Sequence, residues 1–255
     1  MPRYKSVHTG PQIDSGVARA LPGGEIDAAL DSKVEIEFLD NIDFTNPVAQ
    51  AGIGGMHGSV AYAVDRWKLI SGTVSWSSNG LTLNGTIRQI REFSIGFPVV
   101  PSIEMHSGTA TITYDDTTKY CDIISSGGVI KRPHLGIRGI TDWAKIPTLD
   151  REITLRKCQK YYYRCSANYA TGYAYAGVAR FSIPLPVSMR VSSPSIVISG
   201  YLICNGSSEA MGSVLSSSGA DTAVLTLSMN SGLASTFPLC AQPTSVEVIA
   251  DLEGA

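Results

Sequence analysis

From about Ile42 onward, apolar and polar residues alternate along many short segments of the chain. Every second residue is apolar over Thr109–Tyr114, Ala223–Met229 and Val246–Leu252, which predicts strands with one buried face. Turn residues such as Asn79-Gly80 separate these segments, so the pattern predicts an all-β protein of the sandwich type. We expect further strands over Val60–Trp67, Lys68–Trp76, Thr86–Ile95, Tyr120–Ile124, Val129–Lys131, Val178–Ile183 and Ser195–Ser199.

The segment between the two groups of strands has a helical period instead. Leu155, Cys158 and Tyr162 are spaced to fall on one face of a helix over Leu149–Tyr163, with basic residues on the other face. Asp150 stands where the N-cap of this helix is needed. We therefore expect a short amphipathic helix that joins two β units.

The first 45 residues have a different pattern. Pro11–Val17 and Gly24–Leu30 align as two copies of one short unit, and each copy places a few apolar residues on a helical stripe. Such stripes are too short to be stable alone in water. We expect this arm to bury its apolar side chains against another protein, the alternative being that it packs on its own β domain. The expected attachment residues are Ile13, Val17, Leu21, Ile26 and Leu30.

These patterns divide the chain into four parts. We expect two jelly-roll-like β-sandwich units, joined by the short helix and preceded by a short-helical or extended attachment arm. The expected boundaries are residues 1–45 for the arm, 46–148 for the first sandwich, 149–165 for the linking helix and 166–255 for the second sandwich.

The charge of the chain argues against several classes of partner. The 255 residues include 20 Lys and Arg and 22 Asp and Glu, for a net charge of −2. A strongly basic nucleic-acid-binding protein is therefore not expected. The apolar runs are far shorter than the ~20 residues that cross a bilayer, and residues 1–30 lack the pattern of a secretory signal. We expect neither nucleic-acid binding nor membrane insertion.

Few residues suggest a metal site or catalysis. The five cysteines have no Cys-x-x-Cys spacing and the four histidines are scattered, which favours buried thiols in a reducing compartment and no metal or cofactor. Neither a nucleophile elbow nor a phosphate-binding loop is found. Asp115-Asp116 is typical of a hairpin turn. We therefore expect no catalytic residues and no enzymatic activity.

Aromatic side chains are the remaining candidates for recognition, because sugar rings stack on aromatic faces and aromatic rings give large contact areas. Trp67 lies at the end of an alternating segment and is expected in the core. Tyrosines that follow the helix lie among Gly and Ala, which leaves their rings accessible to a glycan or a protein. The candidate binding residues are Trp76, Trp143, Tyr169, Tyr173 and Tyr175.

Three segments resemble the sandwich domains of bacteriophage and prophage tail fibres. Tyr62–Trp67 resembles their Tyr-x-x-Asp-Arg-Trp strand, and Leu155–Tyr163 resembles the run that follows their first jelly roll. Pro186–Pro194, which contains Met189 and Arg190, resembles a later Pro-x-x-Met-Arg-x-x-Pro segment. The three segments occur in the same order as in that family.

The resemblance implies a virion protein with carbohydrate-binding-like β-sandwiches, often trimeric and attached by its N-terminal end. We therefore expect a fibre or appendage subunit, made in the bacterial cytoplasm and built into the virion. Residues 1–45 would contact other virion proteins, and the β units would meet a host-surface glycan. The alternatives are a head fibre or capsid decoration protein without a receptor role, or a carbohydrate-binding module of a bacterial surface protein.

Overall fold

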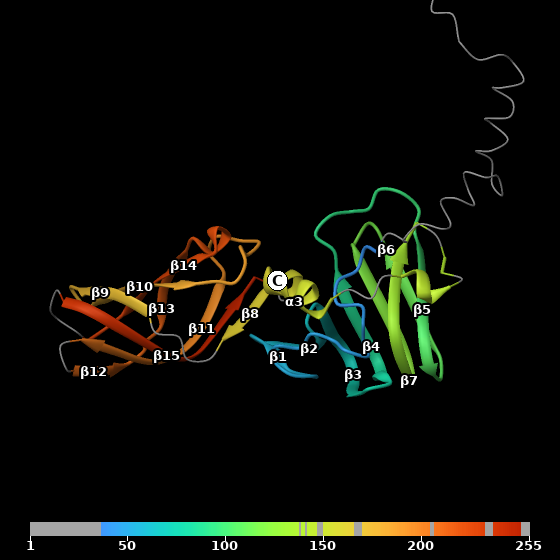
Figure 1. Cartoon of the computed structure of the whole chain (residues 1–255), viewed down its shortest axis with the longest axis horizontal. Helices are drawn as coiled ribbons and strands as arrows, with labels where there is room; N and C mark the ends of the chain where they lie inside the picture. Colours follow the sequence, from blue (N-terminus) through green and yellow to red (C-terminus); the bar gives the residue numbers. More distant parts are fainter. Residues whose placement is uncertain are drawn as a thin grey trace, which may run out of the picture.

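The computed structural model describes residues 37–137, 139–140, 142–146, 150–165, 170–204, 207–232 and 237–250. Over these residues the chain is mostly β, arranged in two antiparallel sheets with one described α-helix. This confirms the expected all-β, sandwich-like fold. The two β units lie along the longest axis of the molecule, and the helix lies between them (Figure 1).

The first unit is a seven-stranded sheet with the order β1-β2-β3-β4-β7-β5, in which β6 also pairs with β7. All of its strand pairs are antiparallel. The strands are β1 (Met56–His57), β2 (Val60–Val64), β3 (Trp67–Ser77), β4 (Gly80–Ile90), β5 (Val100–Ser107), β6 (Ala110–Asp115) and β7 (Tyr120–Gly136).

The core of the first unit includes residues that we assigned to the arm. Leu39, Ile42 and Phe44 are all buried against the inner face of the sheet. The ring of Phe44 meets the fully buried Trp67 edge-on at 5.6 Å, and the Trp67 indole N–H donates to the carbonyl oxygen of Asp40 at 3.2 Å. Trp67 is thus a core residue, as expected, and part of the predicted arm, residues 39–44, contributes to the first core.

The second unit is an eight-stranded sheet with the order β12-β11-β15-β9-β10-β14-β13, in which β8 also pairs with β15. The alternating segments behave as predicted, since Leu225, Leu227, Met229, Val246 and Val248 are all buried in one core. The strands are β8 (Tyr162–Cys165), β9 (Ala170–Tyr175), β10 (Val178–Pro184), β11 (Ser195–Cys204), β12 (Ser207–Ala210), β13 (Val214–Ser218), β14 (Val224–Asn230) and β15 (Phe237–Ile249). Two short 3-10 helices, η1 (Trp143–Lys145) and η2 (Ala220–Thr222), complete the described elements.

The linking helix is shorter than predicted. Helix α3 spans Arg151–Gln159, and the Asp150 carboxylate caps it by accepting from the Glu152 N–H at 2.6 Å. Tyr162 does not continue the helix, because it begins β8 and pairs with the end of β15. Hydrogen bonding to an available sheet edge outweighs the helical spacing at this position.

One expected strand is in fact two strands. Val60–Trp67 is interrupted at Asp65 and Arg66, which form the tight turn between β2 and β3. Arg66 has a φ of 72°, a left-handed conformation that is strained for a residue with a side chain. A second strand ends early, since β4 stops at Ile90 and residues 91–99 form a loop instead of continuing to residue 95.

Replacing the central indole should destabilise the first unit strongly. We expect Trp67→Ala to lower the free energy of unfolding by about 3–5 kcal/mol, because it empties a packed core site. Phe93→Ala is the matched control, since the Phe93 side chain is 70% exposed and its loss should change stability by no more than about 0.5 kcal/mol. Urea unfolding followed by circular dichroism measures both, and equal midpoints for the two variants would contradict the assignment of the core.

Candidate functional site

The turn between β2 and β3 carries a buried carboxylate that links the two units. Asp65 accepts hydrogen bonds from the backbone N–H of Gln50 at 2.9 Å and from its side-chain amide at 2.7 Å. The same amide nitrogen donates to the backbone carbonyl of Tyr162 at 2.8 Å. Gln50 therefore connects the turn of the first unit to the first residue of β8 in the second unit.

A histidine lies between aromatic rings of both units. The His57 ring stacks on Tyr62 of the first unit at 4.3 Å and on Tyr162 of the second at 3.6 Å. Its Nε2 atom is 3.5 Å from the Asp65 carboxylate. All four side chains are buried, and burial raises the pKa of the Tyr162 hydroxyl. This stack gives the contact an apolar centre beside the charged turn.

Arg66 extends from the same turn in the opposite direction. Its guanidinium lies over the ring of Tyr161 at 3.8 Å, and one of its nitrogens donates to the carbonyl of Ile90 at 2.9 Å. Its Nε atom faces Asp40 at 3.5 Å. Arg66 is only 3% exposed, so its charge is stabilised by the ring, the carbonyl and the carboxylate rather than by water.

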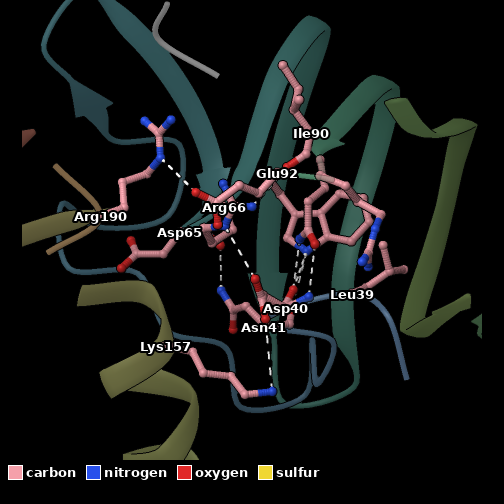
Figure 2. A network of polar contacts seen from close by, with 12 residues as sticks. Leu39, Asp40, Asn41, Asp65, Arg66, Ile90, Glu92, Lys157 and Arg190 are labelled. Atoms are coloured by element: carbon pink, nitrogen blue, oxygen red, sulfur yellow. Dashed lines mark hydrogen bonds and ion pairs between the residues drawn. The ribbon is translucent and has the colours of Figure 1, made fainter. Parts of the chain in front are cut away.

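Two further cations approach the first unit from the other parts of the chain (Figure 2). Arg190 donates its backbone N–H to the carbonyl of Lys160 and a guanidinium N–H to that of Ala250, and its Nε lies 3.4 Å from Glu92. Lys157 of α3 lies 3.9 Å from Asp40.

We call this contact region between the two β units the junction. It is formed by Asp40, Gln50, His57, Asp65, Arg66, Glu92, Lys157, Tyr161, Tyr162 and Arg190.

The junction brings together all three segments that resemble tail-fibre domains. Asp65 and Arg66 come from the first segment, Tyr161 and Tyr162 from the second, and Arg190 from the third. Residues of different segments that are 28–125 positions apart in the sequence thus meet in one place. Their shared task in this structure is to fix the second β unit against the first.

A cavity of about 180 Å³ opens at the edge of the junction. Two carboxylates, Asp40 and Glu92, and two guanidiniums, Arg66 and Arg91, line it. The rings of Phe38, Phe93 and Tyr161 complete most of its wall. Because domain interfaces are frequent positions for ligand sites, this cavity is a candidate binding site.

The loop that carries Phe93 is held in place by one aspartate. The Asp116 carboxylate accepts hydrogen bonds from the N–H groups of Ile95 and Gly96 at 2.6 and 3.1 Å, and from the Tyr114 hydroxyl at 2.6 Å. These bonds, that from Tyr114 foremost, hold the pKa of Asp116 below its ordinary value of 3.8. Burial, aided by the bond to Asp116, raises the pKa of Tyr114 to about 12. Asp115 caps its own turn, as predicted, whereas Asp116 contacts a distant loop instead of only its own turn.

The structure does not gather the candidate aromatic residues into one site. Trp76 lies near the end of β3 and is 46% exposed, whereas Trp143 lies on η1 and packs partly on the first core. Tyr173 and Tyr175 lie together on the outward face of β9, and the hydroxyl of Tyr173 accepts from Arg180 at 3.3 Å. The remaining candidates, Tyr169 and the attachment residues Ile13, Val17, Leu21, Ile26 and Leu30, lie outside the described residues.

The sequence pattern does not mark the residues that line the cavity as a site, because they fall in the predicted arm and in a predicted strand. Asp40 lay in the presumed arm, and Arg91, Glu92 and Phe93 lay in the presumed strand over Thr86–Ile95. A usable signal was present, since the run of charged residues after Ile90 breaks the strand alternation.

Metal ligands, membrane-spanning helices and disulfides do not define a function in the described residues. Within the described ranges no group of three or more His, Cys, Asp or Glu residues is placed to hold a metal ion, and no described helix is long and apolar enough to cross a membrane. Cys121, Cys158, Cys165 and Cys240 form no disulfide, and burial raises the pKa of the Cys121 thiol. No family model, curated protein or solved structure matches the chain.

Removing the buried carboxylate should uncouple the two units. We expect Asp65→Ala to lower the free energy of unfolding by about 3 kcal/mol, since it removes the buried carboxylate that accepts from the backbone N–H and the side-chain amide of Gln50. Asp122→Ala is the control, because Asp122 forms a partly exposed pair with Arg88 within the first sheet and should cost about 1 kcal/mol or less. Calorimetry should show separate transitions for the two units only in Asp65→Ala, and one unchanged transition would oppose this role.

The loop over residues 91–99 should respond to pH at both extremes. The contribution of Asp116 is present above pH 3.8 and is lost as the pH falls through its lowered pKa, whereas that of Tyr114 is present below pH 10 and is lost as the pH rises through about 12. Amide NMR signals of Ile95 and Gly96 should shift on acidification, and Asp116→Asn should mobilise them at neutral pH. Asp115→Asn should leave them in place; mobilisation by both variants alike would contradict the pinning by Asp116.

Proposed function

We propose that the chain is a structural protein of a bacteriophage virion, a fibre or appendage subunit that recognises the host surface without catalysis. The observation that supports this most directly is the meeting of the three tail-fibre-like segments at the junction. Residues of all three segments take part in the contacts that join the two β units there. The resemblance therefore covers segments that contact one another in the folded protein as well as in sequence order.

The arrangement of the two units agrees with such a role. They follow one another along the longest axis, and buried contacts of charge, hydrogen bonds and stacked rings join them (Figure 1). A receptor-presenting protein benefits from this stiffness, because a rigid connection avoids the entropy loss of ordering a flexible one upon binding. The N-terminal residues would attach the subunit to other virion proteins, in a homotrimer assembled in the bacterial cytoplasm.

The proposal includes a glycan as the host-surface ligand. Exposed aromatic residues such as Trp76, Tyr173 and Tyr175 offer faces on which sugar rings stack. Repeated copies on a particle would compensate for the weak binding of each single site.

The proposed attachment predicts which variants enter particles. Removal of residues 1–36 should leave a folded β protein that is not incorporated, because Leu39, Ile42 and Phe44 keep the first core complete. The double variant Ile13→Asp, Ile26→Asp should be incorporated at least about tenfold less, since each change places a charge in an apolar contact. Immunoblots of gradient-purified particles measure this directly.

Ile124→Asp is the matched control for the attachment experiment. Ile124 is also an apolar isoleucine, but it is 51% exposed on β7 within the described sheet. We expect this variant to be incorporated like the parent. If particles take up the truncated chain as well as the full chain, the attachment role is wrong; uptake into capsids that lack tails would instead indicate a head fibre.

A further inference from the structure

We propose that the cavity at the junction binds a single sugar ring, with Asp40 and Glu92 accepting hydrogen bonds from its hydroxyls and Phe93 covering its apolar face. This inference rests on the proposed recognition of a host glycan and assigns it to a site. It also moves the site away from the aromatic residues that the sequence pointed to.

The carboxylates beside the cavity have ion-pair partners on more than one side. Asp40 lies 3.5 Å from Arg66 and 3.9 Å from Lys157, and Glu92 lies 3.4 Å from Arg190. These distances exceed the 2.6 Å of Arg88–Asp122 and Lys131–Glu104 and resemble the 3.5 Å of Arg132–Glu104. A carboxylate offers about four acceptor positions, so Asp40 and Glu92 retain capacity for further donors. Charged groups that converge on one cavity with acceptor positions to spare are suited to bridging by a third group.

The charge of the lining selects the kind of ligand. The cavity is lined by two carboxylates and two guanidiniums, which are close to neutral in sum. A phosphate would meet Asp40 and Glu92, and a cation would meet Arg66 and Arg91, so each would be repelled by half of the lining. A neutral polyhydroxyl ring both donates and accepts, and its hydroxyls can bridge carboxylate and guanidinium at the observed distances.

The apolar part of the wall fits the other face of a sugar. Phe93 is 70% exposed although it lies beside the cavity, and its removal should cost the fold little. An exposed ring next to convergent polar groups is the combination that covers the C–H face of a pyranose. Asp116 fixes the loop from behind through Ile95 and Gly96, so this wall is formed before a ligand arrives.

The size of the cavity limits the ligand to one ring. Its volume of about 180 Å³ is below the ~300–1,000 Å³ of pockets that enclose drug-sized molecules. A single small ring with few atoms binds weakly, with a Kd of about a millimolar. Binding of this strength is useful only when many copies act together on one particle.

Saturation-transfer NMR on the full chain tests the site. The probes are neutral monosaccharides found on bacterial surfaces, namely glucose, galactose, rhamnose, N-acetylglucosamine and N-acetylgalactosamine, with methyl phosphate, whose methyl protons can report binding, as the anionic comparison. We expect at least one sugar to give a signal and methyl phosphate to give none. Glu92→Gln and Phe93→Ala should each weaken that binding at least about tenfold.

Tyr201→Ala is the matched control, because Tyr201 is a 53% exposed aromatic residue of the second sheet outside the cavity. It should bind the sugar like the parent chain. Three results would overturn the inference: no signal from any sugar, a stronger signal from methyl phosphate, or loss of binding in Tyr201→Ala with binding retained in Phe93→Ala. Incorporation of Phe93→Ala into particles is measured in parallel, so that failure of the cavity and failure of the virion role are seen separately.

Discussion

The turn between β2 and β3 places two opposite charges beneath the surface, beside the buried His57 ring of β1, and neighbouring parts of the chain stabilise them. Burying a charge costs several kcal/mol unless partners compensate for it. Asp65 accepts two hydrogen bonds from Gln50 and lies beside His57, whereas Arg66 contacts a ring, a carbonyl and the Asp40 carboxylate. Part of this compensation comes from outside the first unit, since Arg66 lies over the Tyr161 ring and Gln50 also donates to the Tyr162 carbonyl. The two β units are therefore held together by the need to keep buried charges partnered as well as by apolar contact.

The same constraint explains why polar groups remain at the edge of the junction. The Arg66 guanidinium stacks on the Tyr161 ring and donates to the Ile90 carbonyl at 2.9 Å. In this position its Nε lies 3.5 Å from the Asp40 carboxylate. The strained φ of Arg66 indicates that its position is enforced by these neighbours. The contacts that stabilise Arg66 thus leave Asp40 and Glu92 with acceptor positions that face the cavity. The proposed sugar site lies there.

The sequence predicted the β architecture well and the binding region poorly, for physical reasons. Alternation over Ala223–Met229 correctly gave a buried face, because strand periodicity is a local property of the chain. The end of α3 depended on pairing of β8 with β15, and the cavity depended on Asp40 meeting Arg66. These are contacts between distant segments, and no local pattern encodes them.

The outward face of the second sheet takes no part in joining the units. Tyr173 and Tyr175 lie on β9 with their side chains exposed, while the inward residues of the same strand fill the core. Residues on that face are free to vary without altering the direction in which the unit points. In the proposed recognition role, surface substitutions there would change what the protein binds while the folded frame stays the same.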